Sequence, residues 1–150
     1  MVAKVFKRRI LSIDGGGIRG IIPAMVLNYI EERTRKRIET MFHMIAGTST
    51  GGILALGLTK RNSDSSSNYE AEYTAAELID FYRKYGKKIF SEYIPSHIDD
   101  LVQPKFNPIG KQEVLTNLLG EARIEHALRE VFITSYDIEL RTPVFFHKQL

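Results

Sequence analysis

The sequence predicts an α/β fold in which a mainly parallel sheet is flanked by helices. Two short apolar runs alternate with helical stretches over the first 60 residues, and each run ends in a glycine-rich turn. The 150-residue chain is 43% hydrophobic and 26% charged, which is ordinary for a globular protein. A chain of this length suits a single domain, and we assign residues 1–150 to it.

The first half of the chain contains two strand–helix pairs. Residues 9–13 end the first strand, because their apolar run stops at Asp14 and three glycines. Residues 21–37 have helical periodicity, with Pro23 in the first turn, where its missing N–H costs little. Residues 41–46 form a second apolar strand, and residues 53–58 a buried helix. This order implies parallel strands joined by right-handed crossovers.

The second half is predicted to hold three helices and two strands. A polar, serine-rich loop at 61–68 precedes a helix at 74–90, which opens with the capping box Thr74-Ala-Ala-Glu77. We assign its apolar stripe to core packing: Leu78, Tyr82, Tyr85 and Ile89. Three prolines make 91–110 irregular. The remaining elements are helices at 111–119 (ended by Gly120) and 121–128, and strands at 131–136 and 142–147.

The composition excludes several classes of protein. The chain has no cysteine, so it has neither a disulfide framework nor a thiolate metal site. Its N-terminus lacks a signal-peptide pattern, and no stretch approaches the roughly 20 apolar residues of a membrane span. We therefore expect a cytoplasmic protein with peripheral membrane contact. The net charge is +3, but the basic residues cluster at predicted helix ends, so we expect no nucleic-acid partner.

A candidate nucleophile lies in the turn after the second strand. Gly47, Ser49 and Gly51 match the Gly-x-Ser-x-Gly pattern, with Thr48 and Thr50 between them. In a nucleophile elbow the serine occupies a tight strand-to-helix turn, and side chains at the two glycine positions would collide with neighbouring backbone. The apolar strand before this turn and the small-residue helix after it supply that context. A plain polar turn is the alternative interpretation.

The segment Asp14–Gly20 lies between the first strand and its helix and allows three interpretations. Gly15, Gly17 and Gly20 formally match a dinucleotide-binding fingerprint, but the second strand ends without the acidic residue that this fingerprint expects. A Walker phosphate loop would end in Gly-Lys-Ser/Thr, whereas Gly20 is followed by two isoleucines. The third interpretation is an oxyanion hole built from the N–H groups of successive glycines. Only the third gives both glycine turns one task at the same end of the sheet.

Taken together, the glycine loop (residues 14–20) and the serine turn (residues 47–52) resemble the paired motifs of the patatin-like phospholipase family. The resemblance extends along most of the chain, including residues 118–120, 136–138 and 141–146. It implies a patatin-like fold and the hydrolysis of acyl esters of phospholipids and galactolipids, without a metal or other cofactor. The expected partners are therefore a phospholipid or other acyl lipid and a membrane surface.

The same resemblance assigns roles to individual residues. It makes Ser49 the nucleophile and places the oxyanion hole at Gly15, Gly16 and Gly17, with Arg19 beside them. The other motif residues support these two turns: Asp14, Gly20, Gly47, Thr48, Thr50 and Gly51. Asp14 is expected to order its own turn by accepting backbone N–H bonds, and Arg19 either to fix the loop or to meet a lipid phosphate.

A serine nucleophile needs a base, and the sequence offers no recognisable one. The family resembled here uses a Ser–Asp dyad whose aspartate lies in a downstream Asp-Gly-Gly or Asp-Gly-Ala motif, and no such motif follows Ser49. A histidine-containing triad remains an alternative, with these candidates: His97, His126, His147, Asp99, Asp100 and Asp137. The chain stops at Leu150 directly after an apolar strand. We therefore expect an N-terminal portion of a longer hydrolase, with little or no esterase turnover by itself.

Two other functions compete with the serine hydrolase. One is a nucleotide-binding module that uses the loop from Gly15 to Gly20. The other is a non-catalytic regulatory domain that keeps the patatin-like fold.

Overall fold

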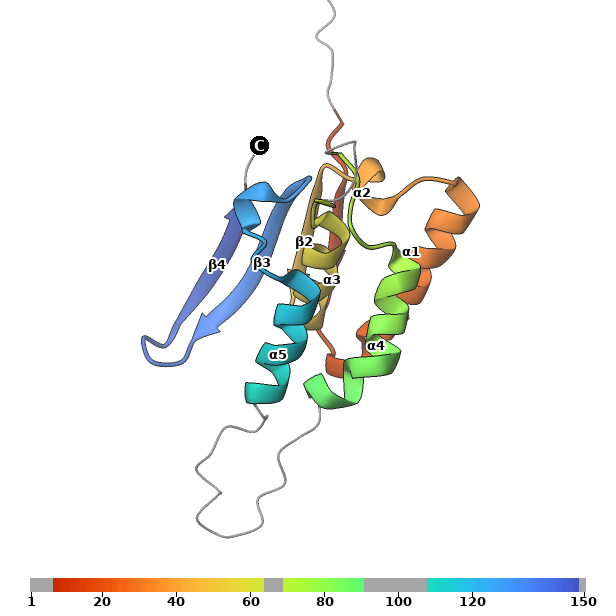
Figure 1. Cartoon of the computed structure of the whole chain (residues 1–150). Helices are drawn as coiled ribbons and strands as arrows, with labels where there is room; N and C mark the ends of the chain where they lie inside the picture. The colour runs from red at the N-terminus through yellow and green to blue at the C-terminus, as the bar shows by residue number, and fades with distance from the viewer. Residues whose placement is uncertain (1–6, 64–68, 91–107, 149–150) are drawn as a thin grey trace, which may run out of the picture.

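The computed structural model describes residues 7–63, 69–90 and 108–148. Figure 1 shows its four-stranded sheet, with strand order β1-β2-β3-β4 and with helices packed beside it. The strands are β1 (Ile10–Ile13), β2 (Met44–Thr48), β3 (Glu130–Asp137) and β4 (Thr142–Lys148). The first two pairs of neighbours are parallel, and β4 returns antiparallel to β3. The predicted mainly parallel α/β fold is confirmed.

The register brings the carboxyl ends of β1 and β2 to one edge of the sheet, beside the middle of β3. Ile13 pairs with Gly47, and Gly47 in turn pairs with Ile133. The turns that follow β1 and β2 are therefore neighbours, as the sequence predicted. This edge is where ligands bind in open α/β sheets.

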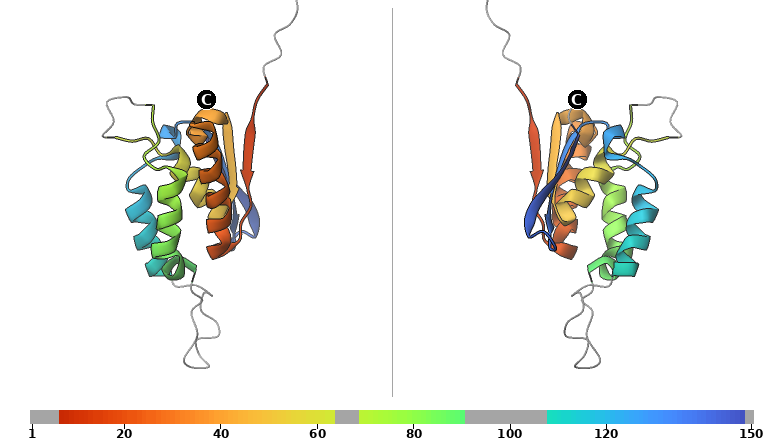
Figure 2. Two further views of the ribbon diagram at one scale, coloured as in Figure 1. Left: turned by 90° about the vertical axis from the view of Figure 1, so that its right-hand side faces the viewer. Right: turned by 90° about the vertical axis from the view of Figure 1, so that its left-hand side faces the viewer.

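The helices gather on one side of the sheet. Figure 2 shows α3 (Thr50–Thr59), α4 (Ala75–Phe90) and α5 (Pro108–Leu119) over one face, with α1 (Ile21–Thr34) against α4 beside β1. The core between these layers is apolar and includes Ile13, Ile45, Leu54, Leu78 and Tyr82. The capping box of α4 also forms: the Glu77 N–H donates to the Thr74 hydroxyl at 3.0 Å, and the Glu77 carboxylate accepts the Thr74 N–H at 2.7 Å.

Several predicted boundaries are wrong, for local reasons. α1 ends at Thr34 rather than residue 37, because Arg35 adopts the left-handed conformation (φ 54°) and donates its N–H to the Glu31 carbonyl. β2 begins at Met44 rather than at residue 41 and ends at Thr48 rather than at residue 46, and a short helix that was not predicted, α2 (Ile38–Met41), precedes it. The predicted helix at 121–128 is only a 3₁₀ turn, η3 (Ile124–His126), and α5 begins at Pro108 inside the segment expected to be irregular. Residues 91–107 and the 64–68 part of the serine-rich loop lie outside the described residues.

A buried ionic cluster joins α1, α2 and the segment before α4. Arg37 lies 3.7 Å from the Glu39 carboxylate and 3.9 Å from that of Glu31, and it donates to the Ala71 and Tyr73 carbonyls at 3.1 and 2.7 Å. Glu39 is only 1% exposed, and its Oε1 accepts the Ala71 N–H. Arg37 was expected on a solvated helix end, but it instead clamps residues more than 30 positions away.

Glu39 makes stability depend on pH. Burial raises the pKa of this carboxyl above its ordinary value, so the folded state holds the proton more tightly than the unfolded state does. Stability is therefore greatest below the unfolded-state pKa of Glu39 and falls as pH rises toward the folded-state pKa. We expect Glu39→Gln to flatten this part of a urea-denaturation series measured against pH. The matched substitution of exposed Glu121 should leave the slope unchanged, and an equal slope in both variants would contradict the assignment.

Among the described residues, no helix is both long enough and apolar enough to cross a membrane.

Candidate active site

Ser49 occupies a strained turn between β2 and α3. Its backbone angles are φ 54° and ψ −119°, a combination that L-residues rarely adopt, and its side chain is exposed. The two motif glycines permit this turn by close backbone approach. A methyl group on Gly47 would overlap the backbone of Gly51, and one on Gly51 would overlap the carbonyl of Ile13. Side chains at the two glycine positions would therefore collide with neighbouring backbone, as the Gly-x-Ser-x-Gly pattern predicts.

The glycine loop lies directly beside this serine. A Cβ on Gly15 would come within 3.1 Å of the Thr48 carbonyl and 3.2 Å of the Ser49 Cβ, so a side chain there would crowd Ser49. Gly17 adopts φ 60°, which glycine reaches without penalty, and it opens a 3₁₀ turn, η1 (Gly17–Gly20). The Thr48 hydroxyl is bonded to that of Thr134 at 2.7 Å, which ties β2 to β3 next to the serine.

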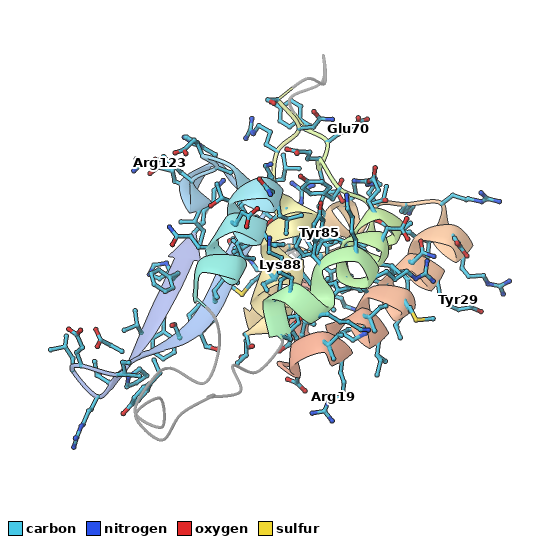
Figure 3. The ribbon with its side chains drawn as sticks, turned by 60° about the horizontal axis from the view of Figure 1, so that its bottom comes forward. Arg19, Tyr29, Glu70, Tyr85, Lys88 and Arg123 are labelled. Carbon is cyan, nitrogen blue, oxygen red and sulfur yellow. The ribbon has the colours of Figure 1, made fainter. Side chains whose placement is uncertain are left out.

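Arg19 takes one of the two places expected of it, whereas Asp14 does not take its expected place. The Arg19 N–H donates to the Gly16 carbonyl at 3.2 Å, so this amide is occupied within the loop. Its side chain is exposed and extends outward from η1 (Figure 3), with its Nε 3.5 Å from the same carbonyl. The geometry favours loop fixing by Arg19 over a direct part in an oxyanion hole. The Asp14 carboxylate makes no hydrogen bond within the described part of the chain, so its expected turn-ordering bonds are not seen there.

One feature of the site was missed by the sequence analysis. Tyr82 of α4 was assigned to packing, and it is indeed 2% exposed, but its hydroxyl also donates to the Thr50 carbonyl at 3.0 Å and is bonded to the Thr50 hydroxyl. Thr50 directly follows Ser49 and is itself buried. The available signal was the phenol itself, because a tyrosine in a core stripe needs a partner for its hydroxyl.

The alternative bases within the described residues do not reach the serine. His147 pairs with Phe132, which pairs with Ala46, so it lies two strands across from a residue three positions before Ser49. His126 belongs to η3, which precedes β3 and so lies at the opposite edge of the sheet. Asp137 accepts the N–H groups of Glu139 and Leu140, both at 2.9 Å, and so shapes the β3–β4 turn. The other triad candidates lie outside the described residues: His97, Asp99 and Asp100.

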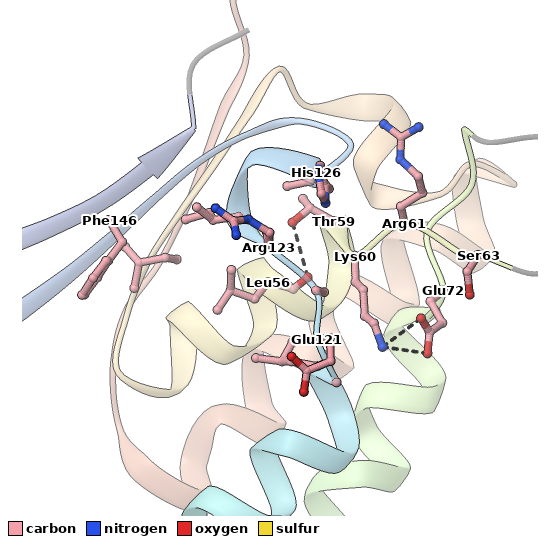
Figure 4. A pocket seen from close by; sticks show the side chains of 16 residues that line it. Leu56, Thr59, Lys60, Arg61, Ser63, Glu72, Glu121, Arg123, His126 and Phe146 are labelled. Atoms are coloured by element: carbon pink, nitrogen blue, oxygen red, sulfur yellow. Dashed lines mark hydrogen bonds and ion pairs between the residues drawn. The ribbon is translucent and has the colours of Figure 1, made fainter.

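Two cavities flank α3 and the glycine loop. The smaller, about 440 Å³, begins at Gly15 and Gly16 and continues over the apolar side chains of Ile22 and Val26 on α1. The larger, about 880 Å³, lies at the far end of α3, where Figure 4 shows the Lys60–Glu72 ion pair on its wall. Thr59 on that wall is ten residues from Ser49, about 15 Å along a helix. The larger cavity reaches toward the serine turn only through Ile133, which packs against Gly52, and no residue from Gly47 to Gly52 lines it. Within the described ranges, no group of three or more acidic or histidine side chains could hold a metal ion.

Comparison with known proteins identifies the class to which this fold and these paired turns belong. Residues 11–148 match the family model described as patatin-like phospholipase. The chain is 41% identical over 146 residues to "Probable inactive patatin-3-Kuras 1" of Solanum tuberosum, and 40% identical over the same length to "Patatin-17" of Solanum cardiophyllum. These matches cover 93% of this chain but only 37% and 36% of the two relatives. The chain belongs to the patatin-like phospholipase family.

Proposed function

We propose that this chain supplies the nucleophile and the oxyanion hole of a lipid acyl hydrolase that acts on glycerophospholipids or related acyl esters. The observation that carries the proposal is the meeting of two glycine turns around one exposed, strained serine. Gly15 approaches Ser49 so closely that only glycine fits there without crowding it. Strain of this kind, about 1–3 kcal/mol, persists only where the surroundings impose it, and it concentrates at functional sites.

The chemistry follows from this arrangement. The Ser49 Oγ attacks the ester carbonyl carbon and loses its proton to a base, while the carbonyl oxygen becomes an oxyanion. Backbone N–H groups of Gly15, Gly16 and Gly17 are the proposed donors, joined by the Thr50 N–H at the free end of α3. The C–O bond to the leaving alkoxide then breaks, the alkoxide takes a proton, and water hydrolyses the acyl-enzyme. We place the base outside this chain, in the Asp-Gly motif that the family resemblance implies.

In this chain the reactivity of the proposed nucleophile can therefore be measured separately from ester turnover. A long-chain alkyl trifluoromethyl ketone adds reversibly to a serine, and its equilibrium needs a nucleophile and oxyanion donors. Turnover also needs a positioned base. We expect the ketone to form an adduct detectable by ¹⁹F NMR, while short-chain esters are hydrolysed slowly or not at all. Ser49→Ala should abolish the adduct, and Ser135→Ala, at an exposed serine on β3, should leave it intact.

Each competing function predicts a different result. A non-catalytic patatin-like domain would form no adduct with the ketone, and one relative is named "Probable inactive patatin-3-Kuras 1". A nucleotide-binding module would be stabilised against heat by NAD(H) or ATP rather than by the ketone. Robust ester hydrolysis that is lost in Ser49→Ala would support the hydrolase but contradict the absence of a base. Membrane contact by this chain remains part of the proposal, and sedimentation with phospholipid vesicles tests it.

A further inference from the structure

The buried face of α4 contacts the backs of both catalytic turns. Tyr82, Gly86 and Phe90 are spaced four residues apart and so lie along one side of the helix. Gly20, at the end of the glycine loop, would clash with Thr50 and approach the Tyr82 ring if it carried a Cβ. One turn further along α4, a Cβ on Gly86 would lie 3.1 Å from the Ile18 side chain. The whole 3₁₀ turn of the glycine loop is thus packed against this face of α4.

Phe90 completes the contact at the end of α4. Its ring stacks on that of Tyr82, with centroids 6.1 Å apart and planes 8° apart. A Cβ on Gly17 would lie 3.7 Å from the Phe90 ring, so the ring also packs against the start of the 3₁₀ turn. The two aromatic side chains therefore touch opposite ends of the segment Gly17–Gly20.

The Tyr82 hydroxyl connects this packed face to the serine turn. It donates its single hydrogen to the Thr50 carbonyl at 3.0 Å and accepts the hydrogen of the Thr50 hydroxyl, so each hydroxyl is used once as a donor. Both partners are at most 2% exposed, which shields these bonds from water. Burial also raises the pKa of Tyr82 to about 12, so the hydroxyl remains a donor throughout the neutral range.

We propose that Tyr82 is a positioning residue, which holds the residue after the nucleophile and the end of the glycine loop in one fixed arrangement. The strained backbone angles of Ser49 persist only if the neighbouring residues are held in place. The bonds between Tyr82 and Thr50 hold Thr50, which follows Ser49 at the start of α3. An oxyanion hole built from two separate turns works only while their relative position is constant. This inference rests on the proposed function for its catalytic consequence, but the tie itself can be measured without activity.

The test compares two tyrosine-to-phenylalanine variants. Tyr82→Phe removes the tie. Tyr73→Phe removes a similar phenol-to-carbonyl bond, from Tyr73 to the Leu118 carbonyl at 2.9 Å, that is remote from the serine. The first readout is hydrogen exchange of the Ile53 amide, which donates to the Ser49 carbonyl at 3.2 Å and so reports on the first turn of α3. The second is the dissociation constant of the trifluoromethyl ketone.

We expect Tyr82→Phe to speed Ile53 exchange and to weaken ketone binding about tenfold, since both bonds of the Tyr82 hydroxyl are lost and their buried partners on Thr50 are left unsatisfied. Tyr73→Phe should lower the melting temperature by a similar amount with neither effect. Thr50→Val, which removes the other hydroxyl, should be non-additive with Tyr82→Phe. Equal behaviour of the two tyrosine variants in both readouts would overturn the inference. If even the unmodified chain does not bind the ketone, the proposed function fails, and Ile53 exchange alone decides the tie.

Discussion

Gly47→Ala is expected to prevent stable folding of this chain, or to lower its free energy of unfolding by at least about 3 kcal/mol. The new methyl group would overlap backbone atoms of Gly51 and Gly52, which are held in the first turn of α3. A flexible side chain could move aside, but backbone at a helix start packed against a sheet can do so only by moving α3 away from β2. The measurement is urea denaturation followed by circular dichroism.

Gly120→Ala is the matched control for this prediction. Gly120 has a positive φ of 57°, so alanine is strained there, but a Cβ would meet nothing within 4 Å. Its cost should be about 1 kcal/mol, from backbone conformation alone. If both variants lose the same small amount of stability, the overlap at Gly47 is relieved at little cost, and the interpretation of the serine turn as a close backbone crossing is wrong.

The elements that the sequence predicted well are those governed by local patterns. The strand before each glycine turn, the capping box at Thr74 and the end of α5 at Gly120 depend on residues that are neighbours in the chain. The errors arise where distant residues decide the outcome. In the sequence Arg37 resembles the other cations at the end of its predicted helix, yet its guanidinium donates to the backbone carbonyls of Ala71 and Tyr73. No residue near Arg37 in the sequence indicates that these carbonyls are its partners.

The candidate site divides in the same way. Two motifs and the rule that parallel strands end at one edge were enough to place Gly15 beside Ser49. The role of Tyr82 could not be read from its periodicity, because an apolar stripe at helical spacing predicts burial and says nothing about where a hydroxyl points. The exclusion of His126 and His147 likewise required the strand register, since both residues follow Ser49 in the order expected of a triad.

Ser49→Gly is expected to change stability and reactivity in opposite directions. Glycine tolerates φ 54° and ψ −119° far better than serine does, so the variant should unfold with a free energy about 1 kcal/mol higher, despite the greater flexibility of its unfolded chain. The same change removes the proposed nucleophile, and loss of such a serine can reduce hydrolysis by about 10⁶-fold where a complete active site exists. In this chain the equivalent readout is complete loss of the trifluoromethyl ketone adduct.

Ser49→Ala separates the two effects, because it removes the hydroxyl but keeps the Cβ and hence the strain. A stabilised Ser49→Gly beside an unstabilised Ser49→Ala would show that the strain belongs to the backbone turn. Equal stability of all three proteins would mean that the turn holds no strain at Ser49.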